Sequence, residues 1–186
     1  MIGLLEKEEA KASQAIALLE KEEIKAPHTY SEWLGCLDIL KGKNVSASGA
    51  YEALVSGSFS GTEATLSALQ KQIVEAVNAL LNNSTRRFTK NMNDSIIFND
   101  LGSIDLLFDR LKKDVKISLF FEELAFLPKE YREELSRSVR EQMQGFWNDT
   151  VSFLYGQSLE YSNSDLEDAL FLIKRKRLFD FRILVF

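Results

Sequence analysis

Apolar residues recur every three or four positions over most of the chain, which is the spacing of one face of an α-helix. This spacing is lost in the last nine residues, 178–186, which we expect to form an apolar extended tail or a short strand. The pattern therefore predicts an all-α protein. We expect residues 1–186 to form a single bundle-like domain of six or seven helices.

The first 26 residues contain a repeat. Leu4–Ala12 recurs almost letter for letter as Leu18–Ala26, and the offset of 14 residues is two heptads, so both copies present the same face of a helix. The apolar stripe, which includes Leu5 and Leu19, is narrow, and the opposite face is densely charged. Because an isolated helix of this kind is marginal in water, we predict an amphipathic helical arm over residues 1–26 that packs on a partner surface.

Two four-residue patterns resemble capping boxes and mark the starts of two further helices. Thr29-Tyr30-Ser31-Glu32 follows Pro27 and predicts a helix that ends near Lys41. Ser60-Gly61-Thr62-Glu63 predicts a second helix that reaches at least Leu81, because the apolar residues behind it step by three or four.

Two stretches show weaker patterns. Residues 42–61 hold four of the nine glycines, and we expect a short helix over 48–55 within them. Residues 82–100 are polar and rich in asparagine, so we expect irregular backbone there, apart from a turn of helix around 86–90.

The longest apolar stripes predict the centre of the fold. One stripe predicts a helix over 103–127, and Pro128 then starts another over 129–160, so the two should form a long central helical hairpin with helix 62–81 against it. A last helix is expected from Ser164 to about Arg177. The positions of helix 129–160 that should face the core are Tyr131, Leu135, Val139, Met143, Phe146, Thr150, Phe153 and Gln157.

Residues that could carry catalysis are scarce. His28 is the only histidine and Cys36 the only cysteine, so zinc sites, di-iron sites and histidine-based nucleophilic triads all lack partners. We expect His28 to lie on the surface or at a cap, and Cys36 to behave as a small buried apolar residue. The sequence predicts no catalytic residue, no metal site and no cofactor.

Two basic clusters contrast with the net charge of −5. Arg86, Arg87 and Lys90 surround Phe88, and surfaces that bind single-stranded nucleic acid combine cations and aromatic rings in this way. The second cluster closes the last predicted helix and has more cations than a helix end needs: Lys174, Arg175, Lys176 and Arg177. If the two clusters are adjacent in the fold, they would attract an acidic protein or a nucleic acid.

The chain opens without a basic start and apolar run of the secretory type, and it holds no apolar run of about 18 residues. A single cysteine fits a reducing compartment. We therefore expect a cytoplasmic protein with no membrane contact.

These observations favour a non-enzymatic helical module for protein interaction or regulation, which binds a protein partner or associates with itself as a homodimer. Leu5 and Leu19 of the arm, together with the two basic clusters, are its candidate binding residues. Two alternatives stay open. One is a nucleic-acid-associated regulator that uses clusters 86–90 and 174–177, and the other is a small-molecule-sensing helical domain with an apolar pocket among its phenylalanines.

Overall fold

A computed structural model describes residues 25–42, 51, 53–97 and 102–161, and most of these residues are helical, with no strand among them. The all-α class expected from the sequence is confirmed. The elements are α2 (Tyr30–Lys41), α4 (Glu63–Ile97), α5 (Gly102–Phe120), the 3₁₀ helix η1 (Phe121–Glu123) and α6 (Lys129–Tyr161).

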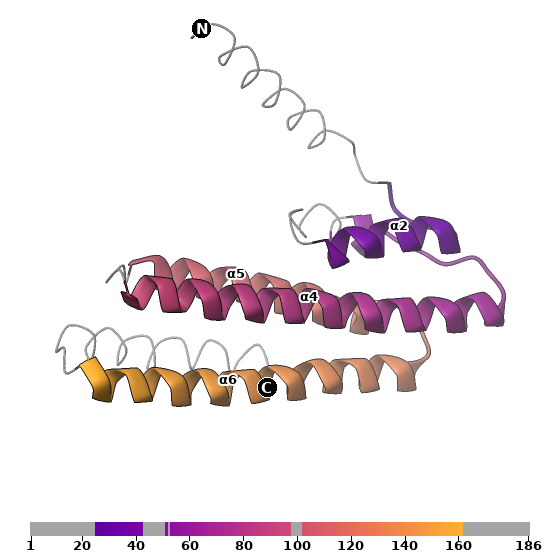
Figure 1. The fold of residues 1–186 in the computed structure, drawn as a ribbon. Coiled ribbons are helices and arrows are strands. Elements are labelled where there is room, and N and C mark those ends of the chain that lie inside the picture. The colour runs from indigo at the N-terminus through magenta and orange to yellow at the C-terminus, as the bar shows by residue number, and fades with distance from the viewer. Residues whose placement is uncertain (1–24, 43–50, 52, 98–101, 162–186) are drawn as a thin grey trace, which may run out of the picture.

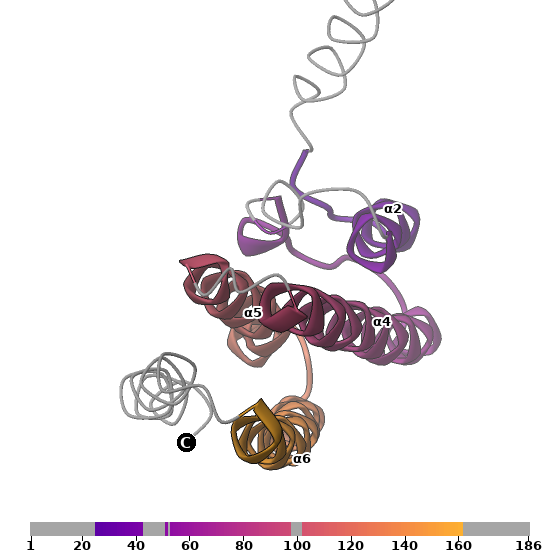
Figure 2. The same cartoon turned by 60° about the vertical axis from the view of Figure 1, so that its left-hand side comes forward.

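The described helices lie in three layers (Figures 1 and 2). Helices α4 and α5 run antiparallel, side by side, and form the middle layer. Helix α6 lies along one side of this pair, and the shorter α2 lies on the opposite side, over the first half of α4. None of the described helices combines the length and the apolar character that crossing a membrane requires.

Helix α2 begins as the sequence predicts. The Thr29 hydroxyl accepts a hydrogen bond from the Glu32 backbone N–H (3.4 Å), and the Glu32 carboxylate accepts one in return from the Thr29 N–H (2.9 Å). The capping box therefore satisfies two N–H groups that the helix leaves without intrahelical partners. The helix ends at Lys41, also as expected, and it buries Trp33, Cys36, Leu37 and Leu40.

Helix α4 differs from the prediction at both ends. Its first turn is capped by Thr62, whose hydroxyl accepts from the Thr65 N–H (3.3 Å). The expected cap, Ser60, instead donates its backbone N–H to the His28 carbonyl (2.9 Å). The helix then continues through Ile97, so the prediction of irregular backbone was wrong over residues 82–97. The reason is a stripe of buried side chains that keeps the helical spacing beyond Leu81: Ser84, Phe88, Met92 and Ser95.

The central pair of helices is also not the predicted one. Helix α5 ends at Phe120 instead of residue 127, and it packs mainly on α4, with fewer contacts to α6. The apolar positions that suggested a longer helix are buried, but in η1 and the turn after it: Phe121, Leu124 and Leu127. The apolar side chains thus remain buried beyond the point where the α-helix ends.

Helix α6 starts at Lys129, directly after Pro128, as expected. Four of its expected core positions are buried: Leu135, Val139, Met143 and Thr150. Phe153 is 40% exposed, so its predicted core position was wrong. It lies six residues beyond the buried Trp147, whose ring packs on Phe108 of α5 (centroids 5.7 Å apart).

The described residues contain five helices, fewer than the six or seven predicted. One reason is that α4 joins two segments that we expected to be separate. The others are matters of coverage: most of the predicted arm (1–24), part of the predicted short helix 48–55 and the predicted helix from Ser164 lie outside the described residues. The predicted tail 178–186 lies outside them as well.

Candidate functional site

Of the predicted binding residues, three lie in the described part of the chain. Arg86 and Lys90 are exposed on α4, and Arg87 is half-buried. The others, namely Leu5, Leu19, Lys174, Arg175, Lys176 and Arg177, lie outside the described residues.

The aromatic residue of the first basic cluster belongs to the core. Phe88 is 4% exposed, and its ring packs edge-on against Phe108 (centroids 4.9 Å apart) and Phe146 (5.6 Å). It cannot stack on a nucleic-acid base, so the expected combination of cations with an accessible ring was wrong. The cause is the continuation of α4, which places residue 88 on the buried stripe one turn after Ser84.

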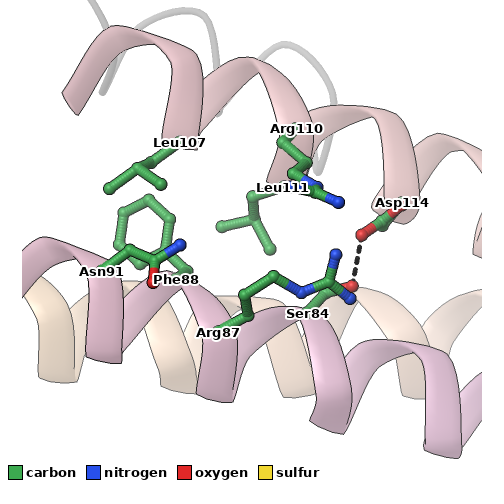
Figure 3. Close-up of a pocket in the computed structure, with 8 residues that line it drawn as sticks. All are labelled: Ser84, Arg87, Phe88, Asn91, Leu107, Arg110, Leu111 and Asp114. Atoms are coloured by element: carbon green, nitrogen blue, oxygen red, sulfur yellow. Dashed lines mark hydrogen bonds between the residues drawn. The ribbon is translucent and has the colours of Figure 1, made fainter. Parts of the chain in front are cut away.

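A pocket opens between α4 and α5 at this point (Figure 3). Its cavity volume is about 10 Å³, roughly the space that a single water molecule needs. The pocket is therefore too small to enclose an organic ligand. Its lining consists of Ser84, Arg87, Phe88, Asn91, Leu107, Arg110, Leu111 and Asp114.

The floor of the pocket is apolar and its rim is cationic. Phe88 and Leu111 are buried beneath it. The guanidinium groups of Arg87 and Arg110 project from the two facing helices toward one end of the pocket, where the Asp114 carboxylate lies (Figure 3). One carboxylate therefore faces two guanidinium groups, and the pocket keeps a surplus of positive charge.

Neither arginine has an ion-pair partner among the described residues. The ion pairs within this part of the chain involve Lys41, Lys129 and Arg140. The Asp114 carboxylate instead accepts a hydrogen bond from the Ser84 hydroxyl. Arg87 and Arg110 are thus held close to apolar surface with donors available for an incoming acceptor.

Further cationic side chains lie next to the rim on both helices. Lys90 lies three residues after Arg87, and Lys113 lies three residues after Arg110, so each lysine shares a helix face with its arginine. Leu106 lies four residues before Arg110 and is 71% exposed. We call the eight pocket residues together with Lys90, Leu106 and Lys113 the distal groove.

One side of this groove is predictable from the sequence and the other side is not. Arg86, Arg87 and Lys90 are close in sequence and were recognised as a cluster. Arg110 and Lys113 are flanked by Asp109 and Asp114, so local charge does not reveal them. Their spacing of three residues was the available signal, and it becomes meaningful only once α5 is known to pack against α4.

Helix α2 sets the limit of the groove. Its last residue, Lys41, donates to the Gln72 side chain (3.0 Å), and its carbonyl accepts from the Asn83 amide (3.4 Å). Arg87 follows Asn83 by four residues and therefore lies on the same face of α4, one turn beyond the end of α2. The groove thus begins where the cover provided by α2 stops.

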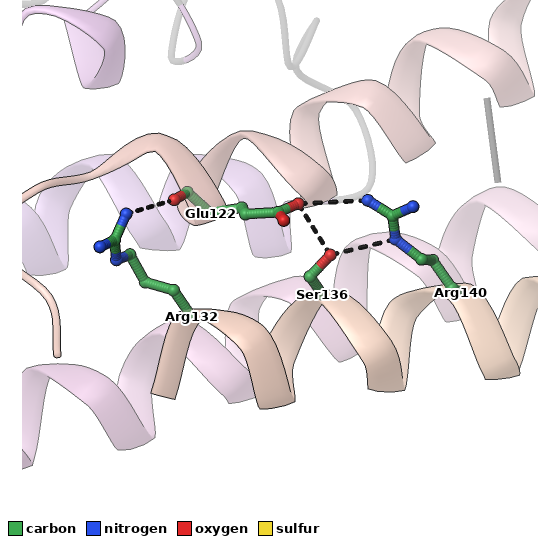
Figure 4. Close-up of polar contacts among 4 residues, drawn as sticks. All are labelled: Glu122, Arg132, Ser136 and Arg140. Carbon is green, nitrogen blue, oxygen red and sulfur yellow. Dashed lines mark hydrogen bonds and ion pairs between the residues drawn. The ribbon is translucent and has the colours of Figure 1, made fainter. Parts of the chain in front are cut away.

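A second polar cluster joins η1 to α6 (Figure 4). The Glu122 carboxylate accepts from the Ser136 hydroxyl (2.8 Å) and from Arg140 (3.3 Å), and the Glu122 carbonyl accepts from Arg132 (2.9 Å). Arg140 also donates to the Ser136 hydroxyl (3.1 Å). The charged groups of Glu122 and Arg140 already satisfy each other, so this cluster fixes the turn between α5 and α6 and offers little to a ligand.

His28 and Cys36 lie in surroundings that suit a structural role. The His28 imidazole Nδ1 lies 2.5 Å from the Ser58 hydroxyl, next to the start of α2. Cys36 is buried, and burial, with a smaller contribution from the Glu32 carboxylate, raises the pKa of its thiol, which favours the unreactive protonated form. Within the described residues, no group of three or more His, Cys, Asp and Glu side chains is placed to hold a metal ion.

Comparison with known protein families, with curated proteins and with solved structures gives no match to this chain.

Proposed function

We propose that this protein is a non-enzymatic helical interaction module, and that its distal groove binds an acidic, leucine-containing segment of a protein partner. One observation supports this above all. Arg87 and Arg110 face each other from two helices over an apolar floor, and neither has an ion-pair partner among the described residues.

The arginines select for carboxylates. A guanidinium group presents a planar set of donors that matches the two oxygens of a carboxylate, and such hydrogen bonds are about twice as strong as neutral ones. Arg87 is half-buried, so an ion pair formed there is screened less than one on open surface. Asp114 lies near both arginines but is hydrogen-bonded to Ser84, so a surplus of positive charge remains that a partner carboxylate would balance.

The leucines add an apolar contribution. Single exposed leucines are common on protein surfaces, but Leu106 lies one helical turn from Arg110 and beside Leu107 of the pocket lining. Covering apolar surface yields about 25 cal/mol per Å². A partner segment with a leucine one turn away from a glutamate or aspartate would satisfy both parts of the groove.

The nucleic-acid alternative keeps its exposed cations, Arg86 and Lys90, but has lost its stacking ring, because Phe88 is buried. Asp94 is also exposed on α4 and would repel a continuous phosphate backbone. For the small-molecule alternative, the pocket between α4 and α5 has space for roughly one water molecule. A protein partner with separate carboxylates fits the groove better than either.

The test is a pull-down from lysate of the source organism with the wild-type protein and an Arg87→Ala/Arg110→Ala variant, each with and without nuclease. We expect the wild type to retain protein partners after nuclease, and the variant to lose them. Arg137→Ala, which removes an exposed arginine of α6, is the matched control and should behave as wild type. Circular dichroism of all three proteins shows whether the helices are intact. Partners that disappear on nuclease treatment would favour the nucleic-acid alternative instead.

A further inference from the structure

The N-terminal arm has a composition complementary to the distal groove. Residues 1–24 lie outside the described part of the chain, but their sequence contains six glutamates and three lysines, and its pattern predicts an amphipathic helix. The groove is cationic and apolar. The arm is acidic, with a leucine stripe.

The spacing of these groups agrees as well. In each repeat a leucine precedes a pair of glutamates by three and four residues: Leu5 precedes Glu8 and Glu9, and Leu19 precedes Glu22 and Glu23. On a helix these glutamates border the leucine stripe, while Lys7, Lys11 and Lys21 lie on the opposite, charged face. In the groove, Leu106 lies four residues from Arg110, so the two side chains are neighbours on α5. A leucine of the arm could therefore contact Leu106 while the glutamates beside that leucine contact Arg110.

We infer that the distal groove binds the N-terminal arm of a second copy of this chain, so that two copies exchange arms. This inference rests on the proposed function and names its partner. A two-fold arrangement satisfies both grooves at once, since each copy contributes one arm and one groove.

The attachment of the arm limits where its second repeat, Leu18–Ala26, can bind. The Pro27 carbonyl accepts from the Ser58 N–H (2.9 Å), which fixes the chain at the start of α2. Helix α2 has 12 residues and is therefore about 18 Å long, and the groove begins beyond its far end. A helix from Ala26 back to Leu19 spans only about 10 Å. As a helix, the second repeat therefore stops short of the groove of its own chain, and the groove of another molecule is the one it can enter.

The test is a charge exchange in the full-length protein. The groove variant carries Arg87→Glu and Arg110→Glu, and the arm variant carries Glu8→Lys, Glu9→Lys, Glu22→Lys and Glu23→Lys. We expect the wild type to be a dimer at micromolar concentration by light scattering, and each variant alone to dissociate with a Kd raised at least about tenfold. An equimolar mixture of the two variants should form a heterodimer, because the reversed arm of one variant meets the reversed groove of the other, and the native arm meets the native groove. Recovery on mixing also shows that both variants are folded.

Three results would overturn the inference: a monomeric wild type, variants that remain dimers alone, or a mixture that stays monomeric. A monomer whose melting temperature falls on deletion of residues 1–24 would place the arm on its own chain. The proposed function is tested separately by the pull-down. If nuclease-resistant capture still depends on Arg87 and Arg110 while arm exchange fails, the groove binds a different acidic protein.

Discussion

The Ser84 hydroxyl of α4 donates a hydrogen bond to the Asp114 carboxylate of α5, and both side chains are buried at the base of the distal groove (Figure 3). A buried carboxylate is costly unless it is hydrogen-bonded, because it has lost its water. The serine therefore makes the burial of Asp114 tolerable. Because the bond joins the two helices, it also helps to fix the register that brings Arg87 and Arg110 to the same pocket.

Ser84→Ala should lower the free energy of unfolding by about 1–3 kcal/mol, because it leaves a buried carboxylate without this donor. Urea denaturation measures the loss. Ser67→Ala, at an exposed position of the same helix, should change stability by less than about 0.5 kcal/mol. In a double-mutant cycle with Asp114→Ala, the two losses should be less than additive. Strict additivity would mean that the two side chains do not interact in solution.

The aromatic core gives a second prediction. Phe121 is fully buried and Phe88 is 4% exposed, so Phe121→Ala and Phe88→Ala should each cost about 3–5 kcal/mol of stability. Phe153 is 40% exposed at the far part of α6, and Phe153→Ala should cost clearly less. Chemical denaturation of the three variants provides the comparison. Equal losses at Phe153 and Phe121 would contradict the burial that distinguishes them.

Much of the fold follows from local sequence. The box at Thr29 and Glu32 was predictable because both of its hydrogen bonds form within four residues. The core positions of α4 up to Leu81 were predictable because their apolar side chains repeat at helical spacing. Residues 82–97 were not, because asparagine and serine suggest a break, whereas the burial of Phe88 and Met92 against other helices favours continued helix.

The candidate site required tertiary structure. Arg87 could be named from sequence, but its partner across the groove, Arg110, lies 23 residues away in a helix of mixed charge. Sequence gave no reason to pair α5 with α4 and not with α6, since the apolar stripe of α5 suits either neighbour. The role of Phe88 was misjudged for the same reason, because whether an aromatic ring near cations is accessible depends on what packs against it.

The capping box gives a pH-dependent prediction. The Glu32 carboxylate accepts hydrogen bonds from the backbone N–H groups of His28 (2.8 Å) and Thr29 (2.9 Å). These two bonds, that from His28 more strongly, hold the pKa of Glu32 below its ordinary value of 4.5. The carboxylate therefore contributes stability above pH 4.5, and the contribution is lost as the pH falls through the lower pKa of the folded state. The difference in urea midpoint between wild type and Glu32→Gln should be constant near neutral pH and shrink in acid. A difference of equal size at about pH 3 and pH 7 would contradict this linkage.

The position of α2 depends on a close approach between Gly57 and Trp33. A Cβ atom at residue 57 would lie 2.8 Å from the Trp33 ring and 3.1 Å from the Leu54 carbonyl oxygen. The ring has little freedom to move, because it is fully buried and its Nε1–H donates to the Ser58 carbonyl (2.7 Å). Gly57→Ala should therefore destabilise the protein by about 1–3 kcal/mol, the usual cost of overpacking.

Gly35→Ala is the matched control. It lies on the exposed side of α2 with no atom within 4 Å of a new Cβ, so the higher helix propensity of alanine should raise stability by up to about 1 kcal/mol. Thermal denaturation of both variants should show melting temperatures that move in opposite directions. A shift of the same sign in both would mean that the contact between Gly57 and Trp33 does not limit the packing of α2.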